Sequence, residues 1–396
     1  MTESIPKGYQ KTEIGIIPEN WEVKRLGNYA EMSSGGTPIT TNKSYYGGNI
    51  PWVVIADMTR IKKYLFETEK NITEKGLLNS STKLFKKNTL LFAMYASIGK
   101  CAIAKVEVSC NQAILGINSN KLDIEYLYYY LASNEKRFLQ MGQTGTQNNL
   151  NKEIVQNLLI PFPKSKQEQS AIASVLSDTD ELIESLTKLI EKKKNIKQGA
   201  MQELLTGKKI LPGFTGEWEE KVLGEISNIK TGKRNGNEEV DEGKYPFFVR
   251  SQKVKKINSY SFDGEAILIP GEGGIGTIIH YINGKFDYHQ RVYKISNFVN
   301  SNCAKFIYYS LIRNFENHAT KNSVKATVDS LRLPTFLEFK FPSPKDPKEQ
   351  SAIASILSSM DLEIEQLDAK RDKYVDLKQG MMQELLTGRI RLKCQK

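Results

Sequence analysis

The chain has 396 residues, of which 39% are hydrophobic and 26% charged, and its formal net charge is +11. This length predicts two or more domains, and the charge favours an acidic partner, with nucleic acid ahead of an anionic membrane surface. No apolar run approaches the roughly 20 residues that cross a bilayer, and the first ten residues lack the features of a signal peptide. The cysteines have no CxxC spacing, which favours reduced thiols. We therefore expect a soluble, cytoplasmic protein without membrane association.

A long internal repeat is the most informative feature of the sequence. Glu168–Gly207 and Glu349–Gly388 align without a gap at a constant offset of about 181 residues. Both copies begin with EQSAIAS and end with MQELLTG. A weaker similarity precedes each copy, in which Trp21 of the first half matches Trp218 of the second. The sequence therefore predicts an internal duplication, in which each copy has a variable globular part followed by a nearly constant helix.

The two globular segments, 1–160 and 211–342, show the same order of predicted elements. In the first segment we expect buried strands and then a helix at Ile50–Ala56, Thr89–Met94, Gln112–Ile117 and Asp123–Phe138. In the second segment we expect two strands and then a helix at Tyr245–Arg250, Ala266–Pro270 and Cys303–Phe315. A Pro-x-Pro sequence, beginning at Pro161 or at Pro342, breaks the chain just before each copy of the repeat.

The helical regions, 161–210 and 343–396, carry apolar residues at alternating steps of four and three. In the first region these are Ile172, Leu176, Thr179, Ile183, Leu186 and Ile190, and in the second Ile353, Leu357, Met360, Ile364 and Leu367. A period of 3.5 is typical of a coiled-coil seam, and helices of about 35 to 40 residues would be some 50 to 60 Å long. We expect the two helices to pair antiparallel. The alternative is that each seam packs on its own globular domain.

The repeat ends are more alike than seam packing requires. Each MQELLTG sequence ends in a glycine that fits the position after a helix. The near-identity of solvent-reachable residues suggests two equivalent docking surfaces for two copies of one partner, built on Gln202, Glu203, Gln383 and Glu384. A recent gene duplication would explain the same identity, and both interpretations stay open.

Motifs for catalysis are weak. Gly271–Gly276 matches GxGxxG, but a strand-like sequence follows it, so we predict a hairpin or bulge and no dinucleotide site. Asp329, Glu338 and Lys340 have the residue types of a metal-dependent nuclease, a combination that is common by chance. The three histidines lack metal-ligand spacing. No active site and no metal site is therefore predicted.

Polar and basic loops suited to reading DNA occur at matching places in both halves. Gln and Asn can bond adenine, and Lys or Arg can bond guanine or phosphate. The candidates in the first half are Ser33, Ser34, Gly35, Thr37, Lys100, Thr146, Gln147, Asn148 and Asn149. In the second half they are Lys233, Arg234, Asn235, Arg250, Lys253, Gln290, Arg291, Lys321, Asn322, Lys325 and Thr327. Any one of these alone would suggest only a solvated loop.

The sequence resembles the specificity (S) subunit of a type I restriction–modification system over almost its whole length. The resemblance rests on Gly8–Gly27, on the Ser97–Lys100 turn with Asn111–Gln112, and on Thr144–Asn151. Above all it rests on the duplicated P-x-P, EQ-x-AIA and MQELLTG sequence. The second half departs from this pattern at Lys321–Thr327 and at GEGGIG, so its half-site should differ.

The resemblance implies two α/β (α+β) target-recognition domains in a pseudo-two-fold inverted arrangement, separated by the paired helices. Each domain would read one half of a bipartite, asymmetric site on double-stranded DNA, and helix length would set the unread spacer. Two methyltransferase subunits and two restriction–translocase subunits would bind the chain. S-adenosylmethionine, ATP and Mg²⁺ would belong to those partners, so that this chain would be neither an enzyme nor a cofactor carrier.

Two other functions are compatible with the residues. A nuclease using Asp329, Glu338 and Lys340 would cleave DNA with Mg²⁺ in the absence of partners. A protein–protein adaptor would bind partners without any sequence preference on DNA.

Overall fold

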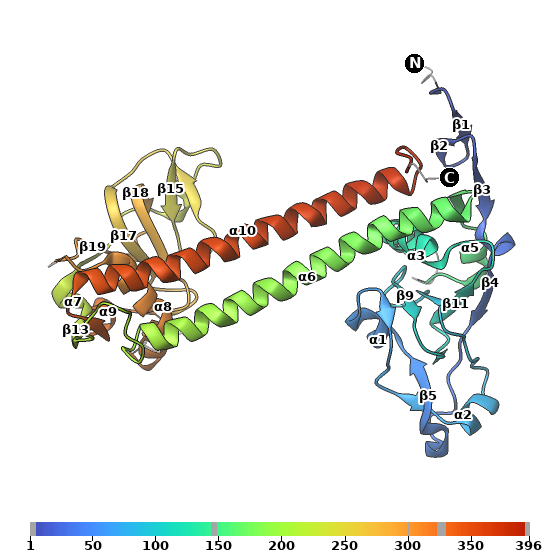
Figure 1. The fold of residues 1–396 in the computed structure, drawn as a ribbon, viewed down its shortest axis with the longest axis horizontal. Helices are drawn as coiled ribbons and strands as arrows, with labels where there is room; N and C mark the ends of the chain where they lie inside the picture. Colours follow the sequence, from blue (N-terminus) through green and yellow to red (C-terminus); the bar gives the residue numbers. More distant parts are fainter. Residues whose placement is uncertain (1–4, 144–148, 300, 323–329, 393–396) are drawn as a thin grey trace. The chain divides into compact units, whose positions relative to one another are not determined.

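The computed structural model describes residues 5–143, 149–299, 301–322 and 330–392. The chain forms two compact units, Met1–Ser185 with Lys370–Lys396 (unit 1) and Leu186–Ala369 (unit 2). Two helices of 39 residues, α6 (Lys166–Leu204) and α10 (Pro347–Leu385), each contribute one part to each unit (Figure 1).

The core of unit 1 is a five-stranded sheet. Its strand order is β4 (Glu31–Ser34), β11 (Ile114–Asn118), β8 (Leu90–Ala93), β9 (Cys101–Ala104) and β6 (Tyr64–Leu65). The neighbours pair antiparallel except β6, which runs parallel to β9. Alternate residues of β8 enter different clusters, Leu90 and Phe92 one core and Leu91 and Ala93 another. Both faces of the sheet are therefore covered, which explains the uninterrupted apolar runs.

Smaller elements surround this sheet. The strands are β1 (Tyr9–Thr12), β2 (Gly15–Pro18), β3 (Trp21–Arg25), β5 (Tyr46–Val53), β7 (Asn71–Ile72), β10 (Ser109–Cys110) and β12 (Leu159–Pro163). The helices are α1 (Ile55–Arg60), α2 (Glu74–Leu78), α3 (Ile124–Ser133), α4 (Glu135–Gln143) and α5 (Lys152–Gln156). β1 and β2 form a hairpin, β12 pairs with β3, and β5 lies between β10 and β7.

Three predicted elements of unit 1 differ from the structure. The strand expected at Ile50–Ala56 ends at Val53, because the Asp57 carboxylate accepts from Val54 N at 2.9 Å and caps α1. The helix expected at Asp123–Phe138 is divided at Asn134, whose side chain donates to Tyr130 O. Pro161 lies inside β12, where it pairs with Val23, so the break before α6 comes after the strand.

Unit 2 is built on a six-stranded sheet. Its order is β14 (Asn228–Thr231), β19 (Val292–Ser296), β17 (Phe262–Pro270), β18 (His280–Tyr288), β15 (Tyr245–Phe248) and β16 (Lys255–Ile257). The remaining elements are β13 (Trp218–Val222), β20 (Lys340–Pro344), α7 (Leu223–Ile226), α8 (Ala304–Asn322) and α9 (Leu333–Leu337). Gly271–Gly276 lies in the connection between the antiparallel strands β17 and β18, which confirms the predicted hairpin.

The two sheets share one plan. β14, β19, β17 and β18 follow the order and pairing of β4, β11, β8 and β9. In both units a strand that carries the Pro-x-Pro sequence pairs with the strand that begins at the repeated tryptophan, so that Trp21 faces Pro163 and Trp218 faces Pro344. The weaker sequence similarity around Trp21 and Trp218 therefore reflects a duplicated fold.

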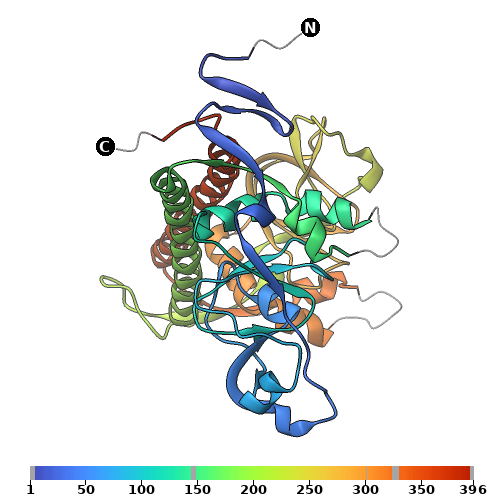
Figure 2. The ribbon, with the colours of Figure 1, turned by 90° about the vertical axis from the view of Figure 1, so that its right-hand side faces the viewer.

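The helices α6 and α10 pack antiparallel and run side by side in both views (Figures 1 and 2). In unit 2, Lys193 Nζ lies 2.6 Å from Glu363 Oε1. The helix ends also enter the globular cores. The residues in the unit 1 core include Ile172, Leu176 and Leu385, and those in the unit 2 core include Leu204, Ile353 and Leu357. The seam is thus divided, since the helices pair with each other and each also packs on the globular domains.

The helix ends confirm the predicted role of glycine. Gly207 has φ +68° and Gly388 has φ +72°, a region that residues with a Cβ rarely adopt. A Cβ on Gly207 would lie 3.1 Å from the Trp218 ring, and one on Gly388 would lie 3.3 Å from the Trp21 ring. The repeated glycine and the repeated tryptophan are therefore packing partners.

Candidate nucleic-acid interface

In unit 1 one end of the five-stranded sheet gathers loops from four parts of the chain. Gly36 N donates to Cys110 O at 2.8 Å, Met94 N to Ala113 O at 2.8 Å, and Leu150 N to Met94 O at 3.0 Å. We call residues 33–37, 94, 111–113 and 149–150 the first loop cluster. It contains the sequence-predicted Ser33, Ser34, Gly35, Thr37 and Asn149.

The first loop cluster presents amide and hydroxyl groups. The Thr37 hydroxyl donates to Gln112 Oε1 at 2.5 Å. Gln112 is exposed, while Thr37, Ser33, Ser34 and Asn149 are half-buried. Within the described residues nothing accepts from the Gln112 NH₂ group, which leaves two donors for an outside acceptor.

Gly35 has a different role from its neighbours. It is buried, and a Cβ at this position would lie 2.0 Å from Cys110 O. Its equivalent in unit 2 is Gly232, where a Cβ would lie 2.1 Å from Tyr288 O. Both glycines let the backbone approach the neighbouring strand closely, and so they shape the loop cluster.

Lys100 is separated from the other predicted residues of unit 1. Its backbone O accepts from Ala93 N, beside the first loop cluster. The residue, however, also lines a cavity of about 710 Å³ together with Tyr128, Ser177 and Lys378. This cavity adjoins the long helices.

In unit 2 the corresponding end of the sheet gathers the equivalent loops. Gln290 N donates to Arg234 O at 2.9 Å, Gly271 N to Arg291 O at 2.8 Å, and Leu331 N to Gly271 O at 2.7 Å. We call residues 231–235, 250, 271–272, 289–291 and 330–332 the second loop cluster. It contains the sequence-predicted Lys233, Arg234, Asn235, Arg250, Gln290 and Arg291.

The second loop cluster is basic and centred on one carboxylate. Glu272 Oε2 lies 3.1 Å from Arg250 Nη1, and Glu272 Oε1 lies 3.0 Å from Arg291 Nη1. Glu272, Arg291 and Arg332 line a cavity of about 390 Å³. Burial lowers the pKa of His289, and the positive charges of Arg250 and Arg291 lower it further. This end of the sheet therefore favours anions.

Arg234 is engaged by unit 2 itself. Its Nε donates to Asp287 at 3.1 Å, Nη1 to Glu238 at 2.9 Å, and Nη2 to Ser259 at 3.0 Å. The hydrogen bond to Asp287 is the main reason that the pKa of Arg234 is raised. Its neighbours Lys233 and Asn235 are exposed. Arg234 therefore anchors the loop that presents them.

Asn235 and Gln290 lie together on the surface of the second loop cluster. Gln290 Nε2 donates to Asn235 Oδ1 at 2.8 Å, and both residues are exposed. This pair resembles the Thr37–Gln112 pair of unit 1 in place, since each pair joins the loop after β4 or β14 to the turn before β11 or β19.

The remaining predicted residues lie apart or outside the description. Lys253 is exposed near Ser251, and Lys321 and Asn322 end α8 and are exposed. Thr146, Gln147, Asn148, Lys325 and Thr327 lie outside the described residues. The predicted docking residues Gln202, Glu203 and Gln383 are exposed, and Glu384 is half-buried. Their settings match, because Thr206 and Thr387 hydroxyls donate to the carbonyls of Gln202 and Gln383.

Sequence reasoning missed several buried polar contacts of the repeat. Gln169 Oε1 accepts from Asp123 N at 2.7 Å, and Gln350 Oε1 accepts from Cys303 N at 2.9 Å. Each glutamine therefore ties a long helix to the start of a tyrosine-rich helix. Identity of polar residues between the two copies was the signal that could have found these contacts.

Two features bear on the other functions. Of the nuclease residues, Lys340 Nζ pairs with Glu220 at 3.1 Å, and Asp329 lies outside the described residues. In the described ranges, no three His, Cys, Asp or Glu side chains are grouped so that they could hold a metal ion. Across those ranges, too, no helix is both long and apolar enough to span a membrane.

Comparison with known proteins identifies the family. Residues 18–196 and, again, 215–373 match the type I restriction modification DNA specificity domain. The type I restriction enzyme MjaIX specificity subunit of Methanocaldococcus jannaschii is 32% identical over 64% of this chain and 63% of its own length. The MjaVIII specificity subunit of the same organism is 26% identical over 95% of this chain and 94% of its own length.

Solved structures share the fold. The crystal structure of a type I restriction–modification S subunit from M. genitalium has a TM-score of 0.65 at 22% identity, covering 92% of this chain and 96% of that one. A second structure, described in terms of complex assembly and conformational transition of a type I system, has a TM-score of 0.57 at 16% identity, covering 94% and 99%. The two domain matches together span most of the sequence, and one falls in each half. The chain therefore belongs to the family of type I restriction–modification DNA specificity subunits, which recognise DNA, carry no cofactor and leave catalysis to other subunits.

Proposed function

We propose that each loop cluster reads one half of a bipartite, asymmetric site on double-stranded DNA. The observation that carries this proposal is the shared backbone of the two clusters, on which the side chains differ. Gln112 and Gln290 occupy equivalent places, but Arg291 stands in the second cluster where Ala113 stands in the first. Lys233 adds a further charge to the second cluster, whereas the first cluster contains no charged residue. A common scaffold with exchanged side chains is what two readers of different sequences require.

The chemistry of the clusters suggests how they divide recognition. Gln112, Asn149, Asn235 and Gln290 carry amides that can bond adenine through two hydrogen bonds. Lys233, Arg250 and Arg291 can bond guanine or phosphate, and Lys253, Lys321 and Asn322 can add contacts at the edge. Gly35 and Arg234 then act by shaping their loops. The remaining predicted contacts belong to the same proposal, namely Ser33, Ser34, Thr37, Lys100, Thr146, Gln147, Asn148, Lys325 and Thr327.

The helical regions serve assembly and spacing in this proposal. The four-part division into 1–160, 161–210, 211–342 and 343–396 separates two readers from two helical regions. Two methyltransferase subunits dock at Gln202 and Glu203 and at Gln383 and Glu384, and two restriction–translocase subunits complete the complex. Those partners hold S-adenosylmethionine, ATP and Mg²⁺. The complex acts in the cytoplasm, where its DNA is accessible, and the helix pair sets the unread spacer.

The test is to co-express this chain with the methyltransferase encoded beside it and to map methylated adenines on a random-sequence library. We expect two short half-sites around a fixed gap. Replacing Arg291 and Gln290 by alanine should change one half-site only, because both residues lie in unit 2. A complex that assembles and methylates nothing, or a variant that changes both half-sites, would contradict the proposal.

A further inference from the structure

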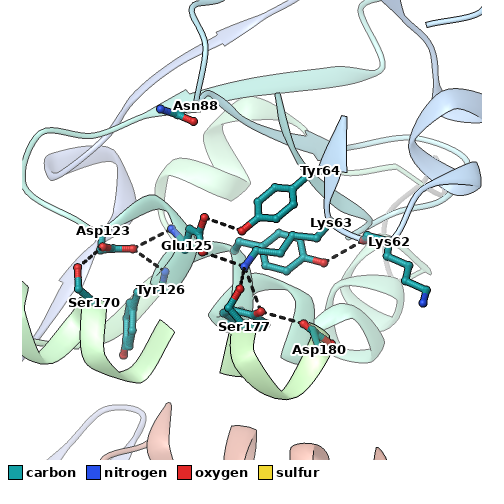
Figure 3. A network of polar contacts seen from close by, with 12 residues as sticks. Lys62, Lys63, Tyr64, Asn88, Asp123, Glu125, Tyr126, Ser170, Ser177 and Asp180 are labelled. Carbon is teal, nitrogen blue, oxygen red and sulfur yellow. Dashed lines mark hydrogen bonds and ion pairs between the residues drawn. The ribbon is translucent and has the colours of Figure 1, made fainter. Parts of the chain in front are cut away.

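In unit 1 a single carboxylate, that of Asp180 (labelled in Figure 3), joins the globular domain to both long helices. The Tyr129 hydroxyl, from α3, donates to Asp180 Oδ2 at 2.8 Å, and Lys378 Nζ, from α10, donates to Asp180 Oδ1 at 2.6 Å. Asp180 itself lies on α6, one turn beyond Leu176, which is in the unit 1 core. Each oxygen of the carboxylate thus bonds a different element.

Unit 2 repeats this arrangement with the two helices exchanged. The Tyr309 hydroxyl, from α8, donates to Asp361 Oδ2 at 2.7 Å, and Lys197 on α6 pairs with Asp361 Oδ1 on α10. Asp361 and Lys378 occupy the repeat positions of Asp180 and Lys197. We call each set a Tyr–Asp–Lys junction.

The junctions constrain the position of a domain on its helices more tightly than the apolar contacts around them do. Apolar packing is non-directional, whereas hydrogen bonds to a carboxylate fix distances and angles. Both tyrosines are buried, and burial is the main reason that their pKa values are raised, so both hydroxyls stay protonated donors. A junction therefore fixes where a globular domain sits on the helices that carry it.

Unit 1 has a second polar tether beside its junction. Lys63 is 7% exposed, and its Nζ donates to Glu125 Oε2 at 2.9 Å, to Tyr129 at 3.1 Å and to Ser177 Oγ at 3.1 Å. Tyr64 also donates to Glu125, at 2.7 Å. Burial acts to raise the pKa of Glu125, but the bonds from Lys63 and Tyr64 outweigh it and lower the pKa. Lys63 thus links the globular domain to α6 at Ser177.

The equivalent serine of unit 2 is bonded differently. Ser358 accepts from Tyr309 at 3.2 Å, and within the described residues no lysine of unit 2 reaches it. Both domains also pack on the helices through apolar and glutamine contacts. Beside its junction, the first domain has the additional tether of Lys63 to Ser177, and the described residues of the second domain show no such lysine.

We propose that the two Tyr–Asp–Lys junctions are the positioning residues that limit which spacer lengths the protein accepts, and that the second junction governs the tolerance. This inference rests on the function proposed above. One base pair more or less moves a half-site by about 3.4 Å along the DNA axis. A domain held at one position on its helices rejects that shift, and a domain released from its junction accommodates it. Since Lys63 still holds the first domain, loss of the second junction has the larger effect.

The test uses variants that each remove one hydroxyl from the full chain, co-expressed with its methyltransferase. The substrates carry the two wild-type half-sites with the native spacer or with one base pair fewer or more. We expect Tyr309→Phe to raise methylation at the altered spacers severalfold relative to the native one, with both half-sites unchanged. Tyr129→Phe should have a smaller effect, which adding Lys63→Met should bring up to that of Tyr309→Phe.

Tyr130→Phe is the matched control, because its hydroxyl donates to Leu159 O within the same domain. It should leave the spacer profile as in the wild type, and melting curves establish that every variant is folded. If the wild type methylates a split site but Tyr309→Phe keeps the wild-type spacer profile, the inference is wrong. Equal loss of methylation at every spacer in a folded complex also overturns it. A wild-type complex without any split site would instead defeat the proposed function.

Discussion

Arg391, near the end of the chain, forms a two-point ion pair with Glu168, near the start of α6. Arg391 Nε lies 2.6 Å from Glu168 Oε1, and Nη2 lies 2.8 Å from Oε2. Trp21 Nε1 donates to the same carboxylate at 3.3 Å. The Glu168 side chain is only 7% exposed, so these donors replace its lost hydration. The contact joins three distant parts of unit 1.

Replacing Arg391 by alanine should destabilise unit 1. It leaves a nearly buried carboxylate with only the Trp21 donor, a loss of about 2 kcal/mol. For a unit of this size the melting temperature should fall by about 4 to 8 °C. Arg389→Ala is the control, because its ion pair with Glu384 is exposed and 3.7 Å long. Equal melting temperatures for the two variants would show that the buried pair contributes nothing.

Unit 2 lacks the cation at the equivalent place. Ile210 occupies the repeat position of Arg391, and the preceding residues Lys209 and Ile390 make the same backbone bond, to Glu203 O and Glu384 O. Glu349 is 1% exposed, and burial raises its pKa. Within the described residues Glu349 Oε1 and Trp218 Nε1 have no hydrogen-bond partner.

Ile210→Arg should therefore stabilise unit 2. The new guanidinium can reach Glu349 as Arg391 reaches Glu168, a gain of about 1 kcal/mol at neutral pH. Urea unfolding of the single variants and the double variant measures the coupling between the two residues. In a Glu349→Gln background the gain should disappear. A gain that survives there would come from the loop and not from the ion pair.

The sequence predicts those features of the structure that depend on residues near one another in the chain better than those that depend on residues far apart in it. The repeat and its period of 3.5 predict both long helices and their pairing, because these depend on local spacing. Ile50–Ala56 reads as one strand, since nothing in that run shows that Asp57 will cap a helix at Val54. Lys100 lines the cavity beside α6, and the Arg234 guanidinium is held by Asp287. Both outcomes depend on residues distant in sequence, which residue type alone cannot reveal.

Lys294 should make the stability of unit 2 vary with pH in the alkaline range. It lies in β19 at 8% exposure, with Nζ 3.4 Å from the centre of the Phe262 ring. Burial, together with a smaller effect of nearby Lys230, lowers its pKa from 10.5 to about 8. The unfolded chain therefore binds more protons between these values, so the contribution of Lys294 to stability rises as the pH goes from 8 to 10.5.

Lys294→Met removes this dependence. Below pH 8 the variant should be more stable than the wild type, and the difference should shrink as the pH rises to 10.5. Urea unfolding at a series of pH values checks this. Lys285→Met is the control, because Lys285 is exposed in β18 and should change stability little at any pH. A stability difference that is constant across the range would mean that titration of Lys294 plays no part.

Replacing the glycines inside the two long helices by alanine should stabilise the protein. Gly199 and Gly380 occupy the same repeat position within α6 and α10, and a Cβ on either would meet nothing within 4 Å. Each change to alanine should stabilise the chain by about 0.5 to 1 kcal/mol, because alanine loses less backbone freedom on folding. Gly35→Ala is the opposite case and should cost about 1 to 3 kcal/mol, since its Cβ would collide with Cys110 O. Thermal unfolding ranks the three variants, and a stable Gly35→Ala protein would contradict the packing described here.

Glu272 should restrain how the second loop cluster binds DNA. It forms ion pairs with both Arg250 and Arg291, and its negative charge would also repel phosphates. Glu272→Gln should therefore tighten binding of the assembled complex to both specific and unrelated duplexes, with the larger gain on unrelated DNA, whose binding is mainly electrostatic. Arg291→Ala should weaken binding and reduce the salt slope by about 1 if the residue contacts phosphate. Fluorescence anisotropy between 50 and 200 mM salt measures both, with Arg371→Ala, in the unit 1 part of α10, as the control. If Glu272→Gln leaves affinity for both duplexes unchanged, the second loop cluster does not face DNA.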